Sequence, residues 1–95
     1  MQFSPDLRDQ VLAGRVTVSF RLWKRPKVKV GGRYRVGTAA IVVDDIDLLP
    51  FSAITEADVR QAGESSRGAL RERAAHAGPI HADTLLYRVE FHVER

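Results

Sequence analysis

The stretch RVTVSFRLW, residues 15–23, alternates apolar and polar side chains without a break. Successive side chains of a β-strand point to opposite faces, so this pattern predicts a strand with two different faces. The apolar face consists of Val16, Val18, Phe20 and Leu22. The other face consists of Arg15, Thr17, Ser19, Arg21 and Trp23. We expect the first face to lie in the core and the second to be polar, basic and accessible.

This strand opens the most basic window of the chain. Residues 15–35 contain eight of the fifteen Lys and Arg residues and none of the twelve Asp and Glu residues. The net charge of +3 therefore conceals a basic block and an acidic remainder. Charge segregated in this way is typical of proteins that meet an extended polyanion. The basic residues ahead of the Gly31–Gly32 turn are Arg15, Arg21, Lys24, Arg25, Lys27 and Lys29.

Length and composition limit the remaining possibilities. The 95 residues predict a single domain over 1–95. The absence of cysteine excludes a disulfide framework and thiolate metal sites. No apolar run approaches the roughly 20 residues of a membrane span, and the N-terminus is too polar for a signal peptide. We expect a cytoplasmic protein without a membrane segment. Neither the three Asp residues of 44–47 nor the three His residues have metal-ligand spacing, so no metal or cofactor is predicted.

Local signals predict three helices. Ser4-Pro5-Asp6 has a capping hydroxyl, a proline at the first helical position and an acid in the first turn, and Gly14 suits the end of that helix. Thr55 and Asp58 are spaced as a capping box for a helix over 55–62. Ser65 or Ser66 begins a third helix that reaches about His76.

Further strands are predicted over 33–36, 39–49 and 85–94, with a brief extended segment over 27–30. In the last strand Leu85, Tyr87, Val89, Phe91 and Val93 are expected to face the core. Few strands with regular alternation and short helices indicate an α+β fold. We expect a small closed or nearly closed β-barrel with the helices packed on it.

Six segments in order resemble the ASCH domain family, and they span nearly the whole chain. They are Leu12-Ala13-Gly14-Arg15, Thr17-Val18-Ser19-Phe20-Arg21, Val28-Lys29-Val30-Gly31, Ile54-Thr55-Glu56-Ala57-Asp58, Ala62-Gly63 and Tyr87-Arg88-Val89-Glu90-Phe91. The resemblance, to the small bacterial single-domain members, implies a PUA-like barrel and an association with RNA. Such members include an amidohydrolase of N4-acetylcytidine and a ribonuclease.

The resemblance also implies roles for individual residues. Arg21 matches the arginine of the family signature, and Val16 stands where the signature has lysine. In the amidohydrolase-like members that lysine acts with a threonine, here replaced by Ser19, and with a glutamate that aligns close to Glu64. A hydroxyl needs a neighbouring base to become a nucleophile, so Val16 weighs against this chemistry. The family's terminal strand lines the pocket, which makes Tyr87 a candidate pocket residue.

These observations favour RNA or single-stranded nucleic acid as the partner. Lys24, Arg25, Lys27 and Lys29 would neutralise phosphates together with Arg15 and Arg21. Thr17 and Ser19 would hydrogen-bond a base or sugar, and Trp23 would stack on a base. The first alternative is a hydrolase of modified nucleosides or of RNA, with Ser19 and Glu64 as catalytic residues. The second is a module whose basic block meets an acidic protein.

Overall fold

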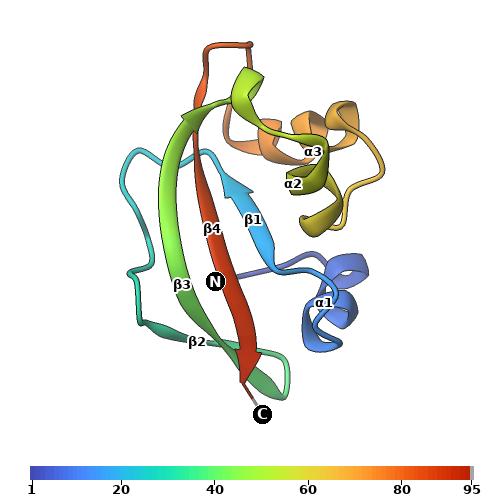
Figure 1. Cartoon of the computed structure of the whole chain (residues 1–95), viewed down its shortest axis with the longest axis vertical. Helices are drawn as coiled ribbons and strands as arrows, with labels where there is room; N and C mark the ends of the chain where they lie inside the picture. The colour runs from blue at the N-terminus through green and yellow to red at the C-terminus, as the bar shows by residue number, and fades with distance from the viewer. Residues whose placement is uncertain (95) are drawn as a thin grey trace.

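The computed structural model describes residues 1–94 of the chain. Four strands and three α-helices make up most of it (Figure 1). The α-helices are α1 (Pro5–Leu12), α2 (Glu56–Gln61) and α3 (Arg67–Ala74). The strands are β1 (Val18–Arg21), β2 (Arg33–Val36), β3 (Ala39–Pro50) and β4 (Leu85–Glu94), and two short 3-10 turns, η1 (Phe51–Ala53) and η2 (Ala75–Ala77), follow β3 and α3. The α+β class is therefore confirmed.

The four strands form one antiparallel sheet in the order β1-β4-β3-β2. The expected barrel is wrong, because β1 and β2 are both edge strands and the sheet stays open. Each of these edge strands has only four residues, whereas the central β3 and β4 have 12 and 10. In Figure 1, α2 and α3 lie beside the upper part of the strands and α1 beside their lower part, and the connection from β1 to β2 runs along the outer side of β3.

The helix boundaries follow the predicted local signals. α1 begins at Pro5, and Gly14 after it has a φ of 78°, which glycine adopts without strain. Thr55 and Asp58 form the complete capping box of α2. Ser66 caps α3 by accepting a hydrogen bond from the Ala69 N–H, although the helix ends at Ala74 and residues 75–77 tighten into a 3-10 turn. Ser4 does not cap α1, because its hydroxyl donates to the Asp6 carboxylate instead.

Both faces of the sheet carry a hydrophobic core. Val18, Phe20 and Leu86 lie on one face, which we call the helical face because residues of α2 and α3 cover it. The opposite face carries Val89 and Phe91 and is covered by Phe3, Leu7 and Val11, so we call it the N-terminal face. Antiparallel partners share a face, and Ser19 and Arg21 are opposite Val89 and Tyr87. The polar side of β1 thus belongs to the N-terminal face.

Two expectations about the strands need correction. The predicted strand over 15–23 is regular only over 18–21, and its polar face turns toward a second core rather than toward solvent. In β4, Val89 and Phe91 are buried as expected, but Leu85 is 52% exposed and Leu86 is fully buried on the helical face. The reason is that each face of β4 is covered over a different part of its length.

The connection between β1 and β2 is a loop, so the extended segment predicted over 27–30 is also wrong. Val28 is its anchor, because this side chain is buried in the core of the N-terminal face. The Lys29 N–H donates to the Tyr34 hydroxyl at 2.9 Å. Gly31 and Gly32 exchange backbone hydrogen bonds with Val43. These contacts hold the loop against β3 and leave Lys24, Arg25, Lys27 and Lys29 exposed.

Candidate nucleic-acid site

The polar side of β1 borders a hollow of about 380 Å³, which we call the Trp23 pocket. Its walls come from the N-terminal segment, α1, β1 and the residues after it, and the end of α3. They are Gln2, Phe3, Ser4, Leu7, Ser19, Phe20, Arg21, Leu22, Trp23, Lys27, Arg73, Ala74 and His76. Four of the predicted site residues therefore line one hollow: Ser19, Arg21, Trp23 and Lys27.

Arg21 is the fixed cation of this pocket. Its Nε donates to the Ser19 hydroxyl at 2.8 Å, and one terminal nitrogen donates to the Gln2 carbonyl at 2.6 Å. The guanidinium carbon lies 5.1 Å from the centre of the Phe3 ring and 6.0 Å from that of Trp23. No carboxylate within residues 1–94 pairs with Arg21, and burial lowers its pKa from the ordinary value. The result is a half-buried, oriented cation that has no counter-ion.

A second polar network closes the pocket beside α3. Arg73 pairs with the Glu64 carboxylate, donates to the Ser4 hydroxyl at 2.6 Å and pairs with Asp6 at 3.0 Å. These bonds to Glu64 and Asp6 raise the pKa of Arg73. Glu64 and Ser19 both border a hollow of about 30 Å³ next to the Trp23 pocket. Arg73 was not among the predicted site residues, because a charged residue on a short polar helix gives no sign of a distant partner, and neither was His76, which follows in η2.

The Asp6 carboxylate gives this network an acid-sensitive component. Its bonds to Ser4 and Arg73 lower its pKa from 3.8 to about 2. A lowered pKa contributes stability that is present above pH 3.8 and lost as the pH falls toward 2. Asp6→Asn should therefore flatten the decrease in the free energy of unfolding across this range, as urea titrations at successive pH values would measure. Asp9→Asn is the matched control on α1, and a slope that both variants share would contradict the assignment.

The other predicted site residues lie outside the pocket. Arg15 is exposed in the turn after α1. The backbone of Thr17 bonds to Gln61 and Phe91, and its side chain does not line the pocket. Lys24, Arg25 and Lys29 stand on the adjoining loop, exposed and without an ion pair within the described residues. The Tyr87 ring lies 6.2 Å from the Trp23 ring, at the edge of the pocket.

Val16, at the position of the family lysine, is 2% exposed and packs in the core of the N-terminal face. Ser19 accepts a hydrogen bond from Arg21, and no carboxylate or imidazole of the described residues bonds to its hydroxyl. The Glu64 carboxylate is occupied by Arg73. Within the described residues, the Ser19 hydroxyl therefore has no neighbouring base.

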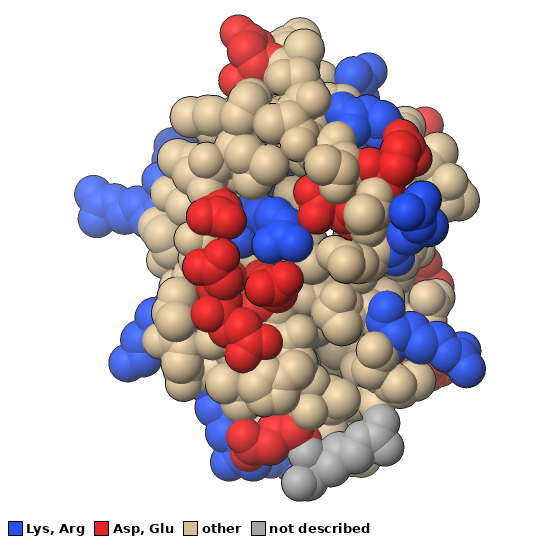
Figure 2. Space-filling model, viewed as in Figure 1, with Lys and Arg blue, Asp and Glu red and all other residues tan. Residues whose placement is uncertain are grey.

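The acidic residues of β3 and β4 form a patch on the opposite, helical face of the sheet. Figure 2 shows a patch of Asp and Glu side chains around a basic side chain over β3 and β4. A β-bulge at Val43–Asp45 interrupts the register, after which Asp45 is opposite Glu90 and Asp47 is opposite Arg88. Arg88 pairs with Asp58 at 3.1 Å, and His92 bonds to Asp44 at 2.9 Å. Within the described residues, no cluster of His, Asp or Glu is arranged to hold a metal ion.

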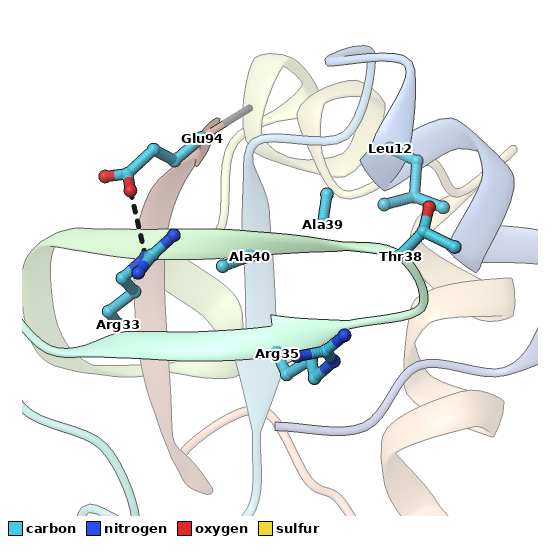
Figure 3. Close-up of a pocket in the computed structure, with 7 residues that line it drawn as sticks. All are labelled: Leu12, Arg33, Arg35, Thr38, Ala39, Ala40 and Glu94. Carbon is cyan, nitrogen blue, oxygen red and sulfur yellow. Dashed lines mark ion pairs between the residues drawn. The ribbon is translucent and has the colours of Figure 1, made fainter.

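A wider hollow of about 620 Å³ lies at the β2–β3 hairpin, away from the Trp23 pocket. Arg33, Arg35, Thr38, Ala39, Ala40, Leu12 and Glu94 line it (Figure 3). Arg33 is directed toward Glu94, and the two form an ion pair of 2.9 Å. One of the two cations that line this hollow is therefore already paired with a carboxylate.

Comparisons with known proteins agree at the level of the fold. Neither a protein-family model nor a curated protein sequence matches the chain. An ASCH domain from Lactobacillus crispatus JV V101 superimposes with a TM-score of 0.76 at 19% identity, over 93% of this chain and 70% of that one. A protein of Enterococcus faecalis V583 from family DUF984 gives a TM-score of 0.69 at 17% identity, over 94% of this chain and 67% of that one. The chain thus has an ASCH-like fold, as the sequence resemblance indicated.

None of the helices in residues 1–94 is long and apolar enough to cross a bilayer.

Proposed function

We propose that this protein binds single-stranded RNA, with one nucleotide in the Trp23 pocket and the adjoining phosphates along the 24–29 loop. The observation that carries the proposal is Arg21, a half-buried guanidinium with no carboxylate partner in the described structure. A guanidinium has five N–H donors, and one terminal nitrogen of Arg21 donates to no described residue. A base carbonyl or a phosphate oxygen would complete its hydrogen bonding.

The surroundings of Arg21 also suit a nucleotide. Trp23 supplies an indole at the pocket wall, and stacking a base on an aromatic side chain contributes roughly 1–3 kcal/mol. Lys27 lines the pocket, and Lys24 and Arg25 stand beside it without ion pairs in residues 1–94. The acidic patch lies on the other face of the sheet, so it would not repel a polyanion bound here. The fold shared with an ASCH domain adds support.

Binding is favoured over hydrolysis by the state of the candidate catalytic residues. One observation favours a hydrolase, because Ser19 and Glu64 line the same small hollow. The Glu64 carboxylate is nevertheless bound to Arg73. The Ser19 hydroxyl accepts a hydrogen bond from Arg21, and no described base lies beside it to remove its proton. We therefore propose a hydrolase of modified nucleosides or RNA only as the second candidate.

Neutralising the loop tests the proposed function. The triple variant Lys24→Ala, Arg25→Ala, Lys27→Ala should bind a labelled single-stranded RNA about 100-fold more weakly at low salt, because three phosphate contacts are lost. The slope of log affinity against log salt should become shallower by about 2, since each phosphate on a single strand contributes about 0.7. Fluorescence anisotropy over a range of salt concentrations measures both quantities.

The matched control removes three exposed arginines from the helices, through Arg8→Ala, Arg60→Ala and Arg71→Ala. The two triple variants have the same net charge, so they separate local contacts from the overall field. Equal losses in both would sink the proposed site on the 24–29 loop. A flat salt dependence of the wild-type protein would sink RNA binding itself.

A further inference from the structure

Part of the N-terminal face of the sheet is left uncovered. Leu48 and Leu85 on this face are 51% and 52% exposed, although large aliphatic side chains elsewhere in the strands are mostly buried. The register places Leu48 opposite Tyr87 and Pro50 opposite Leu85. Because paired residues of an antiparallel sheet share a face, these four side chains form one surface. We call it the open platform: Leu48, Pro50, Leu85 and Tyr87.

The open platform continues directly from the Trp23 pocket. Tyr87 is the register partner of both Leu48 and Arg21, so one row across the sheet joins the platform to the pocket cation. The Trp23 and Tyr87 rings lie 6.2 Å apart at an interplanar angle of 38°. An aromatic pair therefore bridges the two surfaces, and a chain that leaves the pocket over this pair reaches the two exposed leucines.

The distribution of charge near the platform indicates which kind of ligand it could bind. None of its four members is acidic, and the carboxylates of the same strands, Asp45, Asp47 and Glu90, occupy the helical face. The 24–29 loop, with four cations and no acid, begins right after Trp23. An apolar surface that lies next to the Arg21 cation and whose own members carry no carboxylate suits the flat bases of a strand whose phosphates follow the 24–29 loop.

We infer that the open platform receives the bases of the one or two nucleotides next to the one held in the Trp23 pocket. This inference rests on the proposed function and extends it, because it assigns the protein a site several nucleotides long rather than a pocket for a single nucleotide. Stacking on the Tyr87 ring and apolar contact with the two leucines tolerate any base, since every base has a π-face. The platform would therefore add affinity without adding sequence preference.

The length dependence of binding tests this inference. The wild-type protein should bind a single-stranded RNA pentamer more tightly than a mononucleotide. In Leu48→Thr, Leu85→Thr that difference should shrink by about tenfold, while mononucleotide affinity stays unchanged. Threonine suits an exposed strand position, so the variant should fold, and circular dichroism checks this. Val30→Thr is the matched control, because Val30 is 59% exposed but lies outside the platform.

The other possible results of this experiment distinguish failure of the platform inference from failure of the proposed function. A pentamer affinity that is the same in the platform variant and the wild type would overturn the inference and leave the proposed pocket standing. Failure of the wild-type protein to bind either RNA would overturn the proposed function first. If the platform variant loses concentration-dependent self-association in sedimentation but keeps its RNA affinity, the occupant is a second copy of the chain and the inference is wrong.

Discussion

Replacing Gly63 with alanine should lower the free energy of unfolding by about 3 kcal/mol, because an unfavourable backbone conformation and a steric clash combine. Gly63 has a φ of 78°, in the left-handed region where a side chain is disfavoured by about 1–2 kcal/mol. A Cβ atom built here would lie 2.7 Å from Cγ2 of Val16 and 2.9 Å from Cδ2 of Leu7. Both neighbours are core residues that cannot move away freely. Urea denaturation measures the loss.

Gly31→Ala is the matched control for this prediction. Gly31 has a nearly identical φ of 80°, but a Cβ there would have nothing within 4 Å. It should therefore lose only the conformational contribution, about 1–2 kcal/mol. The difference between the two variants isolates the contact of Gly63 with Val16 and Leu7. Equal losses would contradict the close packing of the turn after α2 against the core.

This packing also explains what stands at the position of the family lysine. Val16 contributes to the wall against which the Gly63 turn closes, and Glu64 follows directly in the chain. A methyl group, rather than an amine, therefore packs against the turn at Gly63. The structure thus gives a steric role to the residue by which this sequence departs from the family signature.

The parts of the fold that depend on local interactions could be predicted from the sequence. The capping box of Thr55 and Asp58, and the turns at Gly14 and Gly31, involve residues close together in the chain. The open sheet could not be predicted, because the alternation of a strand shows that it has two faces but not what covers each one. Leu85 and Leu86 illustrate this: both are leucines, and only the helices packed on one face decide which is buried.

The candidate site, like the fold, could be predicted from the sequence only in part. The alternation over 15–23 placed Ser19, Arg21 and Trp23 on one side, and the structure brings them to one pocket. Arg15 and Thr17 share that parity but precede the regular part of β1, and the structure does not bring them to this pocket. Arg73 was missed because its partners Ser4 and Asp6 lie 69 and 67 residues away in the chain. Only the folded structure shows such a long-range contact.

Arg73→Ala should destabilise the protein by about 3 kcal/mol, because it leaves a buried carboxylate without a counter-ion. The Glu64 side chain is 7% exposed and pairs with Arg73, which also binds Ser4 and Asp6. Breaking a buried ion pair costs about 3–5 kcal/mol, and the 38% exposure of Arg73 admits water and places this case at the lower end. Arg71→Ala on the same helix should cost less than about 1 kcal/mol, because Arg71 is exposed, forms no ion pair within residues 1–94 and lies over the Phe51 ring.

A double-mutant cycle separates the ion pair from its surroundings. Glu64→Leu with Arg73→Met removes both charges and keeps apolar volume, so the double variant should be less destabilised than Arg73→Ala alone. The expected coupling energy from urea denaturation is about 2 kcal/mol. Additive losses would mean that Glu64 is solvated after Arg73 is removed, and that the network does not close the pocket. A measured coupling would instead establish that the Glu64–Arg73 pair joins α3 to the turn before it, which fixes one wall of the Trp23 pocket before any ligand arrives.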